Sequence, residues 1–360
     1  MKPKFWPWIW TGCVLLAALA PMRASAQPVC DPAAPPWEEA VRMSELEPAS
    51  FLIYPFYDAR PGGAVTIHTV TNLNFNRVRW DNTFLTGDVL LHYFYVNGTT
   101  CLIFNRSEFL TPGDTLSVIA EQHNPEGDFG YLYVRAEDPE TGWSVDFDYL
   151  VGDQLVVDPR GNFVWSVPAM GFRALTDERF SRVPAEPVRS GTGHAFVDLA
   201  VNDGDEDDLA DFNGYEYAYF PDRLILSSFF ENGRNVDTEL ILITPLDPLA
   251  DVLVNFWFFN NDETRFSRSF RFSCYWGGPL EDISNIVRDL GGDAGEIPVR
   301  GLEAGWAVID GRRATMGETV ISEDPPILGF AVHLFRTPGG AQIGTARPLH
   351  HEGFQCGDDL

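Results

Sequence analysis

Residues 88–97 read DVLLHYFYVN, and residues 251–260 read DVLVNFWFFN. The two segments align without a gap, and each begins with Asp and ends with Asn. Both are short, rich in aromatic and β-branched residues, and apolar at most positions, which is typical of a buried β-strand. The pair predicts two equivalent central strands, one in each half of the chain.

Three further segments recur in the same order around this pair. Residues 52–58 resemble residues 224–231, residues 129–134 match residues 304–309, and residues 150–152 match residues 327–329. Ordered recurrence at such long offsets indicates a duplicated domain rather than a solenoid of short units. We therefore expect an all-β fold of two tandem β-sandwich domains that arose by internal duplication, with little helix.

Alternating side chains predict two more strands, over residues 143–148 and 270–276. The best helix candidate is Leu280 to Leu290, where Pro279 and two acids precede a shared apolar face and Gly291 follows it.

Residues 1–26 have the features of a secretory signal peptide. Lys2 and Lys4 supply the positive charge, residues 8–20 a short apolar run, and residues 24–26 a small-residue cleavage pattern. The apolar run is too short to span a bilayer, and no later stretch is long and apolar enough for a membrane helix. We expect a secreted, periplasmic or cell-surface protein without membrane insertion.

The repeat and the composition divide the rest of the chain into five parts, each domain being long enough to bury its own core. These are an N-terminal segment (27–48), β-sandwich domain 1 (49–175), an acidic connector (176–222), β-sandwich domain 2 (223–349) and a C-terminal tail (350–360).

The formal charge is −27. Removal of the signal peptide would take away Lys2, Lys4 and Arg23 but no acid, which makes the remaining chain still more negative. Such a field repels nucleic-acid phosphates and attracts divalent cations and basic partners. The charge therefore argues against a nucleic-acid partner.

Residues 109–118 read FLTPGDTLSV, and residues 70–74 read VTNLN. These segments resemble the turn-plus-strand signature and an earlier strand end of bacterial extracellular immunoglobulin-like domains. The second copy departs from the pattern, because residues 274–283 keep Gly-Gly-Pro and lose the Pro-Gly-Asp-Thr order. The resemblance implies an immunoglobulin-like sandwich, and domains of that kind mostly serve as spacers, adhesion modules or binding surfaces.

Acids alternate along residues 203–211, as in a calcium-binding loop. The expected Ca²⁺ ligands, at loop positions 1, 3, 5 and 9, are Asp203, Asp205, Asp207 and Asp211. Position 6 is Asp208 where Gly is usual, and position 12 lacks the usual acid, which Asn213 or Glu216 would replace. The alternative is an acidic, solvated connector.

Four cysteines follow the signal peptide: Cys30, Cys101, Cys274 and Cys356. An even number in an exported chain favours disulfides over free thiols. Three pairings exist. We favour Cys30 with Cys101 and Cys274 with Cys356, because each bond would tie a terminal segment to the nearer domain.

The sequence lacks the common motifs of nucleophilic, phosphate-binding and metalloprotease sites. Asp146 and Asp148 could mimic a glycosidase pair, but a water-facing strand explains them. His350 and His351 lie close to Cys356, and we favour an exposed tail over a metal site there.

The leading interpretation is a non-enzymatic secreted or cell-surface protein with a structural or adhesive role toward a protein or glycan surface. The alternative is a secreted carbohydrate-binding or carbohydrate-cleaving protein that stacks sugars on exposed aromatic rings. A concave groove with several solvent-facing aromatics and convergent acids would favour the alternative, whereas flat faces and buried tryptophans would favour the structural role.

Overall fold

A computed structural model describes residues 47–79, 84–158, 163–174, 189–195, 197, 217, 220–231, 235–244, 250–260, 265–284, 303–340 and 342–351. These residues confirm the predicted all-β class. Helix among them is limited to two single turns, α2 (Ala120–His123) and α3 (Leu280–Ile283). The helix predicted from residue 280 to 290 therefore begins as expected but ends at Ile283, because the backbone of Ser284 is extended, and its residues 285–290 lie outside the described part.

The first half contributes a five-stranded sheet in the order β4-β3-β6-β1-β9. Its strands are β1 (Phe51–Asp58), β3 (Val89–Asn97), β4 (Ile103–Leu110), β6 (Phe129–Glu137) and β9 (Met170–Phe172). The second half contributes a sheet in the order β13-β12-β15-β10-β19, with β16 paired to β15. Its strands are β10 (Arg223–Glu231), β12 (Asp251–Asn260), β13 (Arg265–Phe272), β15 (Glu303–Met316), β16 (Thr319–Glu323) and β19 (His350–His351).

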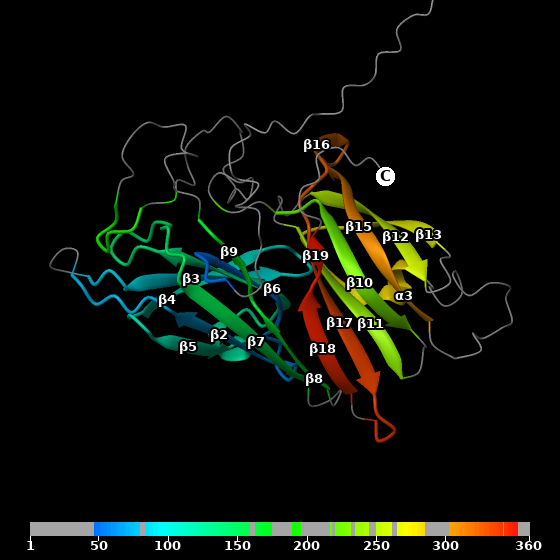
Figure 1. Cartoon of the computed structure of the whole chain (residues 1–360), viewed down its shortest axis with the longest axis horizontal. Coiled ribbons are helices and arrows are strands. Elements are labelled where there is room, and N and C mark those ends of the chain that lie inside the picture. The colour runs from blue at the N-terminus through cyan, green and yellow to red at the C-terminus, as the bar shows by residue number, and fades with distance from the viewer. Residues whose placement is uncertain are drawn as a thin grey trace, which may run out of the picture. The chain divides into compact units, whose positions relative to one another are not determined.

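A third sheet of eight strands is shared by both halves, in the order β14-β11-β17-β18-β8-β7-β2-β5 (Figure 1). Its strands are β2 (Val65–Asn72), β5 (Thr115–Ile119), β7 (Leu150–Asp158), β8 (Phe163–Pro168), β11 (Val236–Ile243), β14 (Tyr275–Pro279), β17 (Leu328–Arg336) and β18 (Gln342–Pro348). The halves meet where β18 and β8 pair in parallel, with Gln342 opposite Phe163 and Ile343 opposite Val164.

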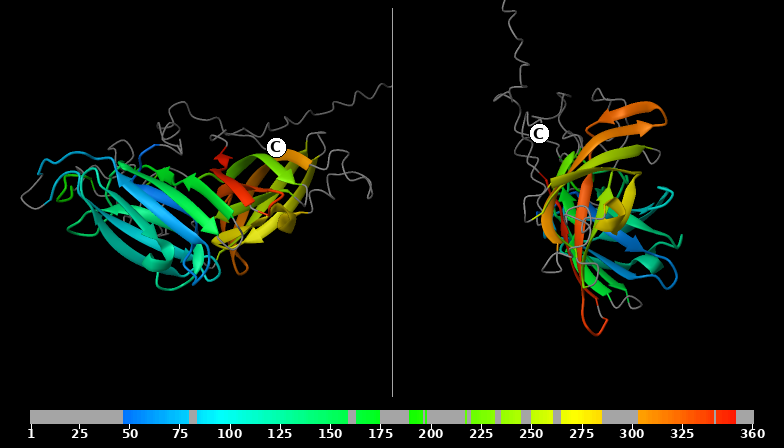
Figure 2. Two further views of the ribbon diagram at one scale, coloured as in Figure 1. Left: turned by 90° about the horizontal axis from the view of Figure 1, so that it is seen from below. Right: turned by 90° about the vertical axis from the view of Figure 1, so that its right-hand side faces the viewer.

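The strand order of the first half repeats in the second. The matching strands are β1 and β10, β2 and β11, β3 and β12, β4 and β13, β5 and β14, β6 and β15, β7 and β17, β8 and β18, and β9 and β19. The segments matched by sequence occupy equivalent registers, because Asn97 pairs with Gly130 and Asn260 with Gly305. The sequence repeat thus coincides with a repeat of topology, and Figure 2 shows the layered sheets of each half from two further directions.

Three apolar clusters fill the layers. One lies within the first half and one within the second, while the third joins Val156 and Trp165 of the first half to Ile241 and Val332 of the second. In β11, Leu240 and Leu242 belong to the second-half cluster, whereas the alternate residues Ile241 and Ile243 belong to the joining cluster. Both faces of this strand are therefore covered, and each fully buried aliphatic side chain contributes about 1.5–3 kcal/mol.

Two predicted strands differ from the structure. Residues 143–148 lie outside the named strands, and Trp143 is 66% exposed although Val145 and Phe147 are buried. The strand predicted over residues 270–276 is split into β13 and β14 by a bend at Cys274, whose φ of 41° interrupts the extended backbone. The bend also buries Tyr275, which the alternation placed on the polar face.

No helix among the residues that the structure describes has the length and apolar character needed to cross a membrane.

Candidate functional site

Several predicted site residues fall outside the described part of the chain. These are the calcium ligands Asp203, Asp205, Asp207 and Asp211 and the cysteines Cys30 and Cys356. Among the described residues, no three His, Cys, Asp or Glu side chains gather as a metal site would require. The tail expected from residue 350 begins instead as β19, where His350 and His351 pair with Ile225 and Leu224 of β10.

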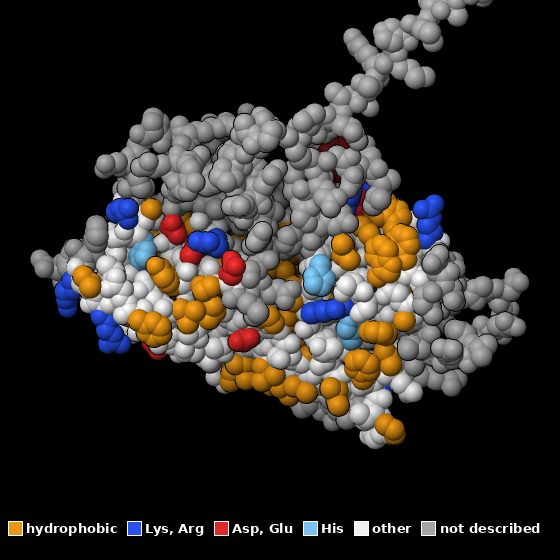
Figure 3. Space-filling view, viewed as in Figure 1, with side chains coloured by type: hydrophobic (Ala, Val, Ile, Leu, Met, Phe, Trp, Pro, Cys, Tyr) orange, Lys and Arg blue, Asp and Glu red, His pale blue; other side chains and the backbone are white. Residues whose placement is uncertain are grey.

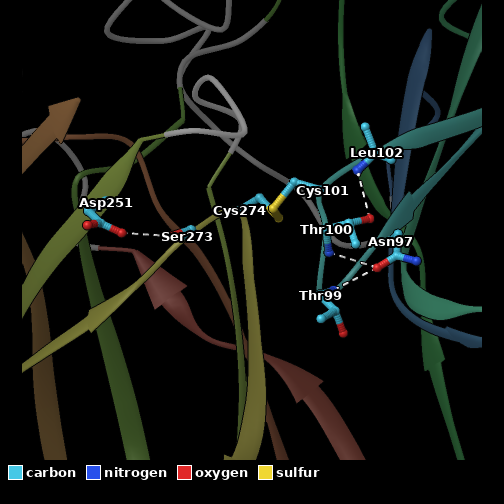
Figure 4. Close-up of a disulfide and its surroundings, with 8 residues drawn as sticks. All are labelled: Asn97, Thr99, Thr100, Cys101, Leu102, Asp251, Ser273 and Cys274. Atoms are coloured by element: carbon cyan, nitrogen blue, oxygen red, sulfur yellow. Dashed lines mark hydrogen bonds between the residues drawn. A yellow bond between two sulfur atoms is a disulfide. The ribbon is translucent and has the colours of Figure 1, made fainter. Parts of the chain in front are cut away.

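Cys101 and Cys274 form a disulfide with a Cα–Cα distance of 6.2 Å (Figure 4). The favoured pairs, Cys30 with Cys101 and Cys274 with Cys356, are therefore wrong. Cys101 follows β3 and Cys274 follows β13, so the bond joins the two halves and not a terminal segment to the nearer domain. Both cysteines have positive φ, 58° and 41°, and their side chains are buried.

The turn that presents Cys101 is held by Asn97 (Figure 4). The Asn97 Oδ1 accepts hydrogen bonds from the backbone N–H groups of Thr99 at 2.8 Å and Thr100 at 2.9 Å. Its Nδ2 donates to the Asp128 Oδ2 at 2.8 Å, and its carbonyl accepts from the Cys101 N–H at 2.8 Å. The side-chain amide thus fixes the left-handed turn that the disulfide needs.

A cavity of about 570 Å³, which we call the junction cleft, lies between the two halves. The first half lines it with Phe56, Phe163 and Trp165, and the second half with Glu239 and Tyr275. Trp165 and Tyr275 are buried, whereas Phe56 and Phe163 are partly exposed. The volume falls within the range of small-molecule sites, about 300–1,000 Å³.

One wall of the junction cleft contains an internal ion pair. The Asp58 carboxylate accepts from the Arg60 Nε and Nη2, each at 2.8 Å, and from the Ala64 N–H at 3.0 Å. Burial opposes ionisation of Asp58, but these hydrogen bonds outweigh it and lower its pKa. The Arg60 guanidinium lies over the Phe129 ring, 4.4 Å from its centre. A Cβ at Gly63 would collide with the Asp58 carboxylate, so the loop requires glycine there.

Glu239 lies on the opposite wall, on β11 between Pro279 of β14 and Val332 of β17. No hydrogen-bond donor or cation among the described residues pairs with its carboxylate. Burial raises the pKa of Glu239, and the nearby Asp237 raises it further. The positive charge of Arg336 lowers the pKa of Glu239, but Arg336 is bonded to Asp237 at 2.9 Å.

A second aromatic surface lies on the outer face of β12 and β15. Phe259 and Trp306 stack with ring centres 4.2 Å apart, and Trp306 is 40% exposed. Trp257 occupies the same face of β12, and Arg312 lies 5.1 Å from its ring centre. We call Trp257, Phe259 and Trp306 the aromatic platform.

Asp146 and Asp148 do not lie on a water-facing strand. Asp148 accepts hydrogen bonds from the Ser50 Oγ at 2.8 Å, the Arg173 Nε at 2.9 Å and the Ala174 N–H at 3.1 Å. Burial raises the pKa of Asp148, and Asp146 raises it further. The contacts of Asp148 tie β1 to the end of β9 and explain the residue without catalysis.

Tyr95, His123 and Glu108 form a hydrogen-bonded chain inside the first half. The Tyr95 Oη lies 2.7 Å from the His123 Nδ1, and the His123 Nε2 lies 3.2 Å from the Glu108 Oε1. Burial raises the pKa of Tyr95 and lowers that of His123. Because the Tyr95 side chain is fully buried, a substrate could not reach its hydroxyl. The three hydrogen-bonded residues therefore stabilise the fold.

Comparison with known proteins gives no significant match to a family model, a curated protein or a solved structure.

The sequence analysis did not identify the junction cleft. Its residues come from distant strands, and only the pairing of β8 with β18 brings them together. One local signal existed, since Glu239 immediately precedes the apolar residues 240–243 of β11 and alternates onto the same face as Ile241 and Ile243.

Proposed function

We propose that the protein is a non-enzymatic secreted or cell-surface protein with a structural or adhesive role. The observation that carries the proposal is the junction: a shared sheet, a common apolar cluster and the Cys101–Cys274 disulfide join the two halves. Disulfides persist mainly in oxidising compartments, which supports export. The signal-peptide features of residues 1–26 and the immunoglobulin-like segments point the same way.

The strongly negative charge favours a basic partner surface, because opposite charge speeds association and excludes like-charged partners. Ca²⁺ bound by Asp203, Asp205, Asp207 and Asp211 would neutralise part of that charge in the connector. Calcium binding is therefore part of the proposed structural role.

Fractionation of the producing cells tests the role directly. We expect the protein in the outer fractions, and we expect deletion of its gene to change attachment of the cells to surfaces. The purified protein should turn over no substrate in a panel of glycosidase and esterase assays. Turnover that survives repeated purification would overturn the non-enzymatic proposal.

A calcium titration tests the metal separately. The melting temperature of the purified protein should rise with Ca²⁺ and fall with chelator, because a ligand bound only by the folded state stabilises it. The triple variant D203N/D205N/D207N should lose this response. Equal melts of the unmodified protein with Ca²⁺ and with chelator would contradict the calcium part of the proposal.

The second candidate function is carbohydrate binding, which the aromatic platform favours. A half-exposed indole stacked on a second ring offers the flat apolar surface on which sugar rings pack. On a glycan array, Trp306→Ala should lose binding by about tenfold or more. Trp143→Ala is the matched control, because Trp143 is exposed and lies in the first half.

A further inference from the structure

The junction cleft combines aromatic walls with a carboxylate that has no counter-ion. Phe56 and Trp165 contact each other with ring centres 6.3 Å apart, and Phe163 adds a third ring from β8. Glu239 faces the same space from β11, without an ion pair or hydrogen bond to any described residue. A carboxylate held in such surroundings without a partner costs stability, and a bound cation would remove this cost.

The opposite wall already shows how this space holds a positive charge. The guanidinium of Arg60 lies between the Asp58 carboxylate and the face of Phe129. A carboxylate on one side and a ring face on the other is a favourable setting for an organic cation. Glu239 and the rings of Phe56, Phe163 and Trp165 offer the same two elements. No cation among the described residues pairs with Glu239 as Arg60 pairs with Asp58.

We propose that the junction cleft binds a small organic cation, an ammonium or guanidinium group on an apolar or aromatic frame, with Glu239 as its counter-ion. A metal ion fits less well, because hard cations require several oxygen ligands and no three acidic, His or Cys side chains of the described residues gather as a metal site would require. An anion is disfavoured because the charge of Arg60 is neutralised by Asp58. This binding is independent of the structural role proposed above, so either proposal can fail alone.

The test uses phenethylammonium as the probe in isothermal titration calorimetry with the full processed protein. The neutral 2-phenylethanol and the anionic 3-phenylpropionate have comparable frames and differ in charge. We expect phenethylammonium to bind about tenfold or more tightly than either of them. Equal binding of the ammonium and the alcohol would overturn the requirement for a cation, and preference for the anion would assign recognition to Arg60.

Glu239→Gln supplies the site-specific variant, since it keeps the size of the side chain and removes its charge. We expect it to weaken phenethylammonium binding by about tenfold or more. The same variant should raise the melting temperature, because it removes the charge of a half-buried carboxylate that lacks a partner. A stabilised protein with weakened binding distinguishes loss of the site from loss of the fold.

Glu318→Gln is the matched control, because Glu318 is exposed in the turn between β15 and β16. It should leave both the affinity and the melting temperature unchanged. Phe163→Ala removes one ring from the cleft and should weaken the ammonium probe as well. Absence of phenethylammonium binding at millimolar concentration, or unchanged binding by Glu239→Gln, would overturn the proposal.

Discussion

Tyr95 and Phe258 occupy the same position in the two halves, each pairing with the equivalent residue of the neighbouring central strand, Leu132 or Ala307. The Tyr95 hydroxyl donates to the buried His123, whereas Phe258 packs among the rings of the second-half cluster. His123 corresponds to Ile283 in the same way, at the end of α2 and α3. One half thus keeps a buried polar chain where the other has an apolar core.

Replacement of Tyr95 by Phe should destabilise the protein by about 1–2 kcal/mol, because it leaves the buried His123 Nδ1 without its donor. The double variant Y95F/H123I, which copies the second half, should cost less than the sum of its single variants. Urea unfolding measures each free energy. Tyr149→Phe is the control, because Tyr149 is 42% exposed and should change stability little. A double variant whose loss of unfolding free energy equals the sum for the two single variants would contradict an energetic coupling between Tyr95 and His123.

His68 should make the protein less stable in acid. Burial lowers its pKa to about 4 from the usual 6.5, so the unfolded chain binds a proton that the folded chain refuses. The free energy of unfolding should therefore fall as the pH drops from about 6.5 to about 4, by about 3 kcal/mol for this residue. His333, whose pKa burial also lowers to about 4, adds to the same fall.

The variant His68→Leu, which places the second half's Leu240 side chain at this position, should show a smaller fall between pH 7 and pH 4. Denaturant midpoints at several pH values measure it. His350→Gln controls for loss of an exposed histidine and should follow the unmodified protein. If the free energy of unfolding fell equally with pH in His68→Leu and in the unmodified protein, His68 would be accessible to protons in the folded state.

Loss of the disulfide should lower stability without separating the halves. The variant C101A/C274A opens a bond that spans 173 residues, and we expect it to lose about 2–4 kcal/mol. Unfolding should remain a single transition, because the β8–β18 pairing and the joining cluster are still present. Two separate transitions in a calorimetric scan would show that the halves unfold independently.

The strand pattern could be predicted because its information is local. Residues 88–97 and 251–260 carry their apolar character within ten positions, and their partners Gly130 and Gly305 lie in segments that also match. The same reasoning failed where one residue changes the backbone direction. The positive φ of Cys274 reverses the alternation, so Tyr275 turns into the interior.

The junction could not be predicted from local patterns. Phe163 and Gln342 pair where β8 of the first half meets β18 of the second. The alternation of side chains in either strand does not indicate which strand it pairs with. The disulfide was missed for a related reason: proximity along the chain favoured terminal pairings, whereas the fold brings the turn after β3 to the link after β13. Asp58 and Glu239 line one cleft for the same reason, because only the long-range pairing of β8 with β18 brings their strands together.

Peptide mapping of the non-reduced protein tests the junction most directly. Digestion under acidic, thiol-blocked conditions and mass spectrometry should yield a linked peptide pair that contains Cys101 and Cys274 and separates on reduction. Recovery of Cys101 linked to Cys30, or of Cys274 linked to Cys356, would contradict the junction that the structure describes.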